Sequence, residues 1–203
     1  EMLSNYIKGN TWDEMMDNNS IRVPYQRLFE ALAGLSEEQI AQKNTEASEL
    51  FMNQGITFTV YSDKEGIERI FPFDIIPRII TSKEWEQIEQ GIKQRLKALN
   101  LFLKDIYQEQ QIIKDKIIPA WLIASCPHYT REVYGINVPH DLYVHISGID
   151  LIKGADGKFY ILEDNLRTPS GVSYMLENRE VTKRIFPSMV TNNQVKMINN
   201  YPL

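Results

Sequence analysis

The chain has 203 residues, of which 43% are hydrophobic and 24% charged; this composition fits a globular protein of one or two domains and excludes extended disorder and a coiled coil. Its net charge of −5, from 22 basic and 27 acidic side chains, leaves no basic footprint for a nucleic-acid backbone. A single cysteine, Cys126, excludes an intrachain disulfide and a cysteine-based zinc site, and it fits a reducing cytoplasm.

Signals for membrane insertion and for export are also absent from the sequence. No run approaches the ~18 consecutive apolar residues of a membrane span, and the opening residues EMLSNYIKGN contain no apolar signal-peptide segment. We therefore expect a cytoplasmic protein without a membrane partner.

The first predicted elements are two helices that follow an N-terminal arm. Residues 1–22 are interpreted as an extended arm or a short helical turn. Apolar residues at helical spacing predict a helix over 23–35. Ser36 and Gln39 then form a capping-box pattern, so a second helix is predicted from Ser36 to about Asn53.

A hairpin and a long helix are predicted next. The segments 56–61 and 67–73 are rich in β-branched and aromatic residues and flank a polar stretch, which favours a β-hairpin. Thr81 and Glu84 supply a second capping box at the start of a long helix. The apolar stripe of this helix, interpreted as core packing, comprises Trp85, Ile88, Ile92, Leu96, Leu99, Leu103 and Ile106.

Short helices and turns are predicted over 112–140, because this stretch holds three prolines and only brief apolar runs. Trp121 is interpreted there as a core or interface anchor. Two strands are predicted at 142–152 and 158–165, followed by a helix from about 173 to 183.

Few of the reactive side chains in these segments receive a role from the sequence. Cys126 is interpreted as a small core residue. His128 and Arg131 are interpreted as structural or exposed residues, and no role is assigned to Arg78.

The two predicted strands carry the candidate site. If Asp156 and Gly157 form a two-residue hairpin turn, the register places Asp150 directly opposite Glu163. Side chains alternate between faces along a strand, so Glu163 and Asn165 share a face. With a loop of even length, three oxygen-bearing side chains therefore converge on one patch, whereas an odd loop would move Asp150 to the opposite face.

Two carboxylates that face each other repel, so a positively charged group beside them would be stabilising. Repulsion between Asp150 and Glu163 would cost under ~1 kcal/mol when solvated, while Asp164 points to the other face. A hard divalent cation, Mg²⁺ or Mn²⁺, would compensate, because it prefers carboxylate, amide and water oxygens and often binds substrate phosphates as well. The alternative is a solvated hairpin whose acidic residues keep a sheet edge soluble.

Four phrases of the sequence resemble a known family. They are QGITFTVY, IFPFDIIPR, YVHISGIDLI and EDNLRTPSGVSYMLENR, and they look like the circularly permuted ATP-grasp type 2 family, whose members are similar to glutathionylspermidine synthetase. The resemblance covers nearly the whole chain from about Pro24 onward. It implies an α+β, ATP-grasp-like fold with an antiparallel or mixed sheet and packed helices, in which 23–203 is the metal-binding portion.

The resemblance also implies roles for individual residues of the hairpin. Asp150, Glu163 and Asn165 would be the metal ligands. Arg167 would lie beside the transferred phosphate of ATP. The alternative for Arg167 is a salt bridge to Glu163 or Asp164.

A further implied contact is at the start of the following helix, which Ser170 and Gly171 open. Their backbone amides would cradle an anion such as a phosphate group of ATP.

The sequence departs from the family pattern in two places. Gly148 stands where glutathionylspermidine synthetase-like enzymes have an arginine, so a polyamine or glutathione substrate is not implied. The chain also has no Gly-x-Gly or Walker-like loop, and only 38 residues follow Asn165 (203 − 165). We therefore expect the nucleotide-gripping lobe to be missing, either in a fragment of a longer protein, the interpretation we favour, or in a truncated relative that no longer turns over ATP.

Two functions remain open at this point. The first is the Mg-phosphate part of an ATP-dependent carboxylate–amine ligase, which makes an acyl phosphate from a peptide or amino-acid-like carboxylate for attack by an amine. This chain alone would then be inactive. The alternative is a catalytically silent module that binds a peptide or a protein on the same scaffold. A metal-dependent hydrolase is a weaker third option, and the sequence does not fix the oligomeric state.

Overall fold

The computed structural model describes residues 6–60, 67–70, 72–192 and 194–201. Within these residues the chain forms helices and three two-stranded antiparallel sheets, so the expected α+β class is confirmed. No helix in this part of the chain is both long enough and apolar enough to cross a membrane.

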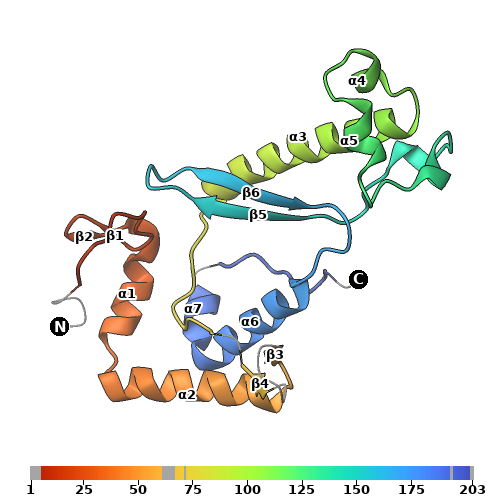
Figure 1. The fold of residues 1–203 in the computed structure, drawn as a ribbon. Coiled ribbons are helices and arrows are strands. Elements are labelled where there is room, and N and C mark those ends of the chain that lie inside the picture. The colour runs from red at the N-terminus through yellow and green to blue at the C-terminus, as the bar shows by residue number, and fades with distance from the viewer. Residues whose placement is uncertain (1–5, 61–66, 71, 193, 202–203) are drawn as a thin grey trace. The chain divides into compact units, whose positions relative to one another are not determined.

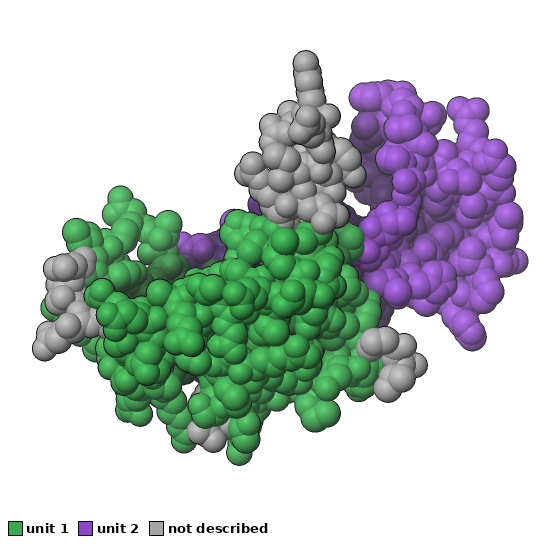
Figure 2. Space-filling view, turned by 90° about the horizontal axis from the view of Figure 1, so that it is seen from below, with its two compact units in different colours: residues 1–80, 170–203 green, residues 81–169 purple. Residues whose placement is uncertain are grey.

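The chain divides into two compact units (Figure 2). Unit 1 comprises residues 1–80 and 170–203, and unit 2 comprises residues 81–169. Unit 1 contains the main hydrophobic core, and unit 2 contains the hairpin with the predicted metal ligands.

Unit 1 begins with a small hairpin and a helix. β1 (Met16–Asp17) pairs with β2 (Ser20–Ile21) in the stretch interpreted as an arm. The helix predicted over 23–35 is present as a 3-10 turn, η1 (Val23–Tyr25), that continues into α1 (Gln26–Ala33).

The second predicted helix, α2 (Glu37–Asn53), begins at the expected capping box. The Gln39 amide donates to Ser36 Oγ at 3.2 Å, and the Ser36 amide donates to Gln39 Oε1 at 2.8 Å. These bonds give acceptors to two amides that lack partners within the helix. Gly55 follows α2 in a left-handed conformation, with φ of +67°, and the helix ends there.

The hairpin predicted for the next segment is also confirmed. β3 (Phe58–Val60) pairs in antiparallel fashion with β4 (Ile67–Arg69). Residues 61–66, which contain the predicted turn, lie outside the described residues.

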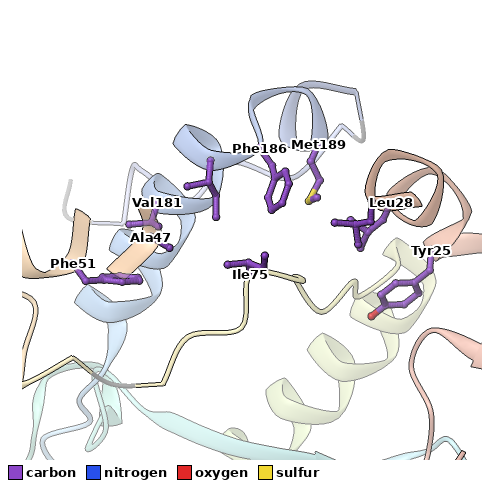
Figure 3. Packing of buried hydrophobic residues seen from close by; sticks show 10 residues of the cluster. Tyr25, Leu28, Ala47, Phe51, Ile75, Val181, Phe186 and Met189 are labelled. Atoms are coloured by element: carbon purple, nitrogen blue, oxygen red, sulfur yellow. The ribbon is translucent and has the colours of Figure 1, made fainter. Parts of the chain in front are cut away.

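The core of unit 1 joins segments from both ends of the sequence. Side chains of α1 and α2 pack with those of α6 (Val172–Ile185), the predicted C-terminal helix, and of α7 (Pro187–Asn192). Ile75 lies between them (Figure 3). Lys43 Nζ donates to the carbonyl oxygen of Ile185 at 2.6 Å and so satisfies an acceptor at the end of α6. The buried residues of this core are Tyr25, Leu28, Leu32, Ala47, Phe51, Ile75, Val181, Ile185, Phe186 and Met189.

Unit 2 is built on the long helix α3 (Ser82–Tyr107), which begins at the second predicted capping box. Glu84 Oε2 accepts hydrogen bonds from the amide and the hydroxyl of Thr81, both at 2.9 Å. β5 (Gly148–Lys153) and β6 (Phe159–Asn165) form an antiparallel hairpin, and α3 runs along one face of it (Figure 1).

Burial along α3 is less extensive than the apolar stripe predicts. Ile88 and Ile106 are buried, but Trp85 is 43% exposed, so its assignment to the core is wrong. The 26 residues of α3 extend about 39 Å, whereas the six and seven residues of β5 and β6 extend roughly 20–23 Å. The hairpin therefore covers only part of α3. Trp85 follows Glu84, which contacts the hairpin, but it lies about 100° around the helix from Glu84 and so beside the covered face.

The first strand of the hairpin is shorter than the predicted 142–152. It begins at Gly148, because β6 ends opposite this residue at Asn165. Before it, the Tyr143 amide donates to Asn100 Oδ1 of α3 at 2.8 Å and so bonds to a helix side chain instead of a neighbouring strand.

Short helices and turns connect α3 to β5, as predicted. Trp121 is 66% exposed and Cys126 is exposed, so neither is a core residue, and the role of Trp121 as an interface anchor stays a prediction. The short elements are α4 (Gln111–Lys114), α5 (Ala120–Ala124), η2 (Arg131–Val133) and η3 (Pro139–Asp141).

Candidate functional site

The hairpin turn differs from the two-residue turn expected at Asp156 and Gly157. The Gly154 amide donates to the carbonyl oxygen of Lys158 at 2.9 Å, which leaves a loop of three residues. Gly157 takes the left-handed conformation, with φ of +75°, that such loops require near their end. The expected turn is therefore wrong, and an odd loop by itself would place Asp150 on the opposite face.

A β-bulge in β6 restores the predicted pairing. Leu151 pairs with Ile161 on the turn side of the bulge. The next pair is Asp150 with Glu163, which leaves Leu162 as the extra residue. Leu162 and Glu163 are consecutive and both exposed, where strict alternation would bury one of them. The predicted position of Asp150 opposite Glu163 is therefore confirmed, although the turn and the strand each differ from the expected hairpin by one residue.

The three predicted ligands meet on the outer face of the hairpin, the face turned away from α3. Asn165 Nδ2 donates to Glu163 Oε1 at 3.0 Å and lies 3.5 Å from Asp150 Oδ1. Glu163 raises the pKa of the Asp150 carboxyl above its ordinary value, chiefly by hydrogen bonding, with slight desolvation and like charge adding to the effect. Asn165 offsets part of this rise. The structure thus brings the three side chains together.

The inner face of the hairpin is tied to α3 by an ion pair between Asp164 and Arg95. Arg95 Nε lies 2.7 Å from Asp164 Oδ1, and Arg95 Nη2 lies 2.6 Å from Asp164 Oδ2, so the pair is bidentate. Hydrogen bonding to Arg95 holds the pKa of the Asp164 carboxyl below its ordinary value. Because Asp164 lies between Glu163 and Asn165 in β6, this ion pair fixes which face the two ligands occupy.

A second ion pair holds the hairpin near its turn. Lys153 Nζ lies 2.6 Å from Glu84 Oε1, and the Lys153 side chain is only 6% exposed. Partial burial would raise the pKa of the Glu84 carboxyl, but hydrogen bonds from Lys153 and Thr81 outweigh it and lower the pKa below its ordinary value. Glu84 therefore caps α3 and binds the hairpin at the same time.

The charge pattern of the sequence is consistent with these two ion pairs, although it was not used to predict them. Glu84 and Arg95 are 11 residues apart, about three turns of helix, so they share one face of α3. Their partners Lys153 and Asp164 carry the opposite charges in the same order along the hairpin. Charge complementarity between the long helix and the strands could have predicted how they pack.

Arg167 lies just after β6 and contacts His128. Arg167 Nη1 is 2.9 Å from His128 Nδ1, and both side chains are exposed. The salt bridge to Asp164 considered for Arg167 is made by Arg95 instead. The next residue, Thr168, has a φ of +49°, a left-handed conformation that is strained for a β-branched residue.

Gly148 packs closely against the turn that follows β6. A Cβ atom at this position would lie 3.0 Å from Pro169 Cβ and 3.7 Å from Asn165 Cβ. The turn that follows Arg167 therefore folds back over Gly148, and a longer side chain would displace it. The close approach of Pro169 gives a steric reason for a glycine at position 148.

Comparison with known sequences identifies the family. A sequence model of the family described as circularly permuted ATP-grasp type 2 matches residues 77–203. The chain belongs to this family. The α+β architecture with small antiparallel sheets is consistent with a circularly permuted ATP-grasp domain.

Relatives of this ATP-grasp protein occur in several bacteria. An uncharacterised protein from Synechocystis sp. is 44% identical over 98% of the chain, and one from Mycobacterium leprae is 42% identical over 94%. A Frankia casuarinae protein named "Putative glutamate--cysteine ligase 2-2" is 34% identical over 88% of the chain. The chain spans 42%, 33% and 20% of the length of these three relatives, respectively.

The donor atoms on the outer face suit a hard divalent cation. Two carboxylates and one amide, from Asp150, Glu163 and Asn165, supply oxygen ligands, and the proximity of the carboxylates favours a positive charge beside them. Within the described residues no cluster of three or more histidine, cysteine, aspartate and glutamate side chains could hold a metal by itself. A cation here would need further oxygens from water or a phosphate.

The remaining predicted contacts lie in unit 1. Gly171, with φ of +96°, is the N-cap residue of α6, and Ser170 precedes it. No side chain caps the first amides of α6, whose residues the structure describes in full. The part of Ser170 and Gly171 in binding an anion stays a prediction.

Proposed function

We propose that the outer face of the hairpin binds a divalent cation, Mg²⁺ or Mn²⁺, together with phosphate groups of ATP, in an ATP-dependent carboxylate–amine ligase. The observation that carries the proposal is the convergence of Asp150, Glu163 and Asn165, with the Asn165 amide within 3.5 Å of both carboxylates. The family supports ATP as the nucleotide.

The proposed ligands would supply both anionic and neutral oxygens to the cation. Asp150 and Glu163 would hold the cation with two anionic oxygens, and Asn165 would add a neutral one after its amide rotates to present oxygen instead of nitrogen. A cation bound there would neutralise the crowded oxygens of the phosphate groups.

Arg167 would hold the transferred phosphate. Its planar guanidinium can donate two parallel hydrogen bonds to phosphate oxygens, which fixes orientation as well as charge. The exposed side chain and its position directly after β6 support this role. The amides of Ser170 and Gly171, at the start of α6, would bind a further anionic group.

The family, and the relative whose name includes glutamate–cysteine ligase, support a ligase reaction. We propose that a peptide or amino-acid-like carboxylate attacks the terminal phosphorus of ATP, which forms an acyl phosphate and releases ADP. An amine then attacks the acyl carbon and displaces phosphate, so that an amide bond forms. The hairpin contributes by positioning and neutralising phosphate oxygens in the first step.

The test is Mg²⁺-dependent formation of ADP by the full-length product of the open reading frame that contains this chain. Glu163→Gln should lower the rate by about 100-fold or more, because it removes a charged ligand from phosphate stabilisation. Glu86→Gln makes the same change on the exposed surface of α3 and should have no effect. Equal rates in wild type and Glu163→Gln would refute the proposed site.

A further inference from the structure

We infer that His128 is a positioning residue for Arg167, one that orients its guanidinium toward a phosphate oxygen. The inference rests on the proposed function, because it concerns how the proposed phosphate-binding arginine is held. It begins from the 2.9 Å contact between Arg167 Nη1 and His128 Nδ1, which joins two side chains 39 residues apart in the sequence.

The chemistry of this contact leaves the arginine charged. An arginine nitrogen only donates, so His128 Nδ1 must accept, and the imidazole is then neutral with its proton on Nε2. A neutral acceptor orients the guanidinium without cancelling its charge. The other N–H groups of Arg167 remain suited to an anion.

Arg95 provides the contrast within the same unit. Its guanidinium donates to both oxygens of Asp164, at 2.7 and 2.6 Å, so its charge is neutralised by a carboxylate. Arg95 thus has a structural partner of opposite charge. Arg167 is oriented by a neutral group, as expected for an arginine whose anionic partner is a ligand.

The backbone next to Arg167 is constrained as well. Thr168 is held at a φ of +49°, and Pro169 packs over Gly148. A β-branched residue keeps such a conformation only where its surroundings impose it, and such strain is concentrated at functional sites. The backbone turn and the imidazole therefore hold the two ends of the Arg167 side chain, which reduces the freedom it loses on binding phosphate.

The test compares His128 variants of the full-length protein by the kinetics of Mg²⁺-dependent ADP formation. His128→Ala removes the acceptor and should lower kcat/KM for ATP by about 10-fold or more, the effect expected when a supporting partner of a ligand is lost. His128→Asn places an acceptor oxygen near the position of Nδ1 and should recover most of the activity. His145→Ala, which truncates another exposed histidine of unit 2, should match wild type.

A double-mutant cycle separates positioning from general structural damage. If His128 acts through Arg167, adding His128→Ala to Arg167→Ala should lower kcat/KM no further. Two outcomes would overturn this inference and leave the proposed function standing. In the first, His128→Ala lowers kcat/KM as much in the Arg167→Ala background as in wild type. In the second, His128→Ala is as active as wild type while Glu163→Gln is inactive. Equal activity of wild type and Glu163→Gln removes the proposed function, and the inference with it.

Discussion

Asp150 and Glu163 set the electrostatics of the outer face of the hairpin. The raised pKa of Asp150 means that folding favours its protonated form, chiefly because the protonated carboxyl hydrogen-bonds to Glu163, and the like charge of Glu163 adds to the effect. The resulting destabilisation is absent below the ordinary carboxyl pKa and complete above the raised value. At neutral pH the pair therefore destabilises the hairpin, and a cation would relieve it.

Replacement of one carboxylate should reveal this effect in the 203-residue chain. Asp150→Asn removes the repulsion, so its melting temperature near pH 7 should be slightly higher than that of wild type. The difference should vanish as the pH falls below about 4, where carboxyl groups are protonated in the unfolded chain as well. Thermal melting monitored by circular dichroism across this pH range measures the difference.

The same variant should be stabilised less by Mg²⁺ than wild type is. Wild type should gain stability, by about 2.7 kcal/mol at a concentration 100 times the dissociation constant, whereas Asp150→Asn should gain little. Glu86→Gln is the control and should behave as wild type in both comparisons. A Mg²⁺ response as large in Asp150→Asn as in wild type would show that the cation binds elsewhere.

At the scale of elements, the hairpin was only partly predictable. The pairing of Asp150 with Glu163 follows from the alternation of strand residues and an even loop, yet the loop is odd and Leu162 compensates for it. Asp156-Gly157 suits turns of either length, since both need a residue in the left-handed conformation. Nothing distinguishes Leu162 in sequence from its apolar neighbours, so the bulge could not be inferred.

The turn after β6 provides a prediction about Gly148. Gly148→Ala should destabilise the chain by about 1–3 kcal/mol, because the new methyl group meets Pro169 Cβ at 3.0 Å and the strained turn must move. Denaturation by urea measures the loss as a lower midpoint at an unchanged slope.

Gly91→Ala is the matched control for Gly148→Ala. Gly91 lies within α3 with no atom near its missing Cβ, so alanine should stabilise the helix by about 0.5–1 kcal/mol. The same substitution should thus act in opposite directions at the two glycines. A neutral or stabilising Gly148→Ala would contradict the packing of Pro169 over β5.

At the scale of the whole molecule, the positions of the helices were predicted more accurately than the burial of individual side chains. Ser36 with Gln39 and Thr81 with Glu84 mark the starts of α2 and α3 because capping is a local interaction. The exposure of Trp85 was not predictable, since periodicity identifies an apolar stripe but not which side of it another element covers. The core of unit 1 depends on contacts between distant segments, which no local pattern encodes.

In the candidate site, too, local sequence patterns identified residues, whereas contacts between residues far apart in the sequence were not predicted. Asp150, Glu163 and Asn165 were found from strand alternation and family resemblance. The contact of Arg167 with His128 joins residues 39 positions apart, and no sequence pattern links them, so it required the structure. The contact of Asp164 with Arg95 spans 69 positions, and only the charge complementarity between α3 and the hairpin points to it.

The most direct test of the central claim is a calorimetric titration of Mg-ATP into the full-length protein. Wild type and Glu86→Gln should bind with the same affinity, while Glu163→Gln and Asn165→Ala should each bind at least about 10-fold more weakly, because each lacks one ligand of the cation. Unchanged affinity in both hairpin variants, or binding of a peptide by a wild-type protein that is indifferent to Mg-ATP, would contradict the assignment of the β5–β6 hairpin as a metal–phosphate site.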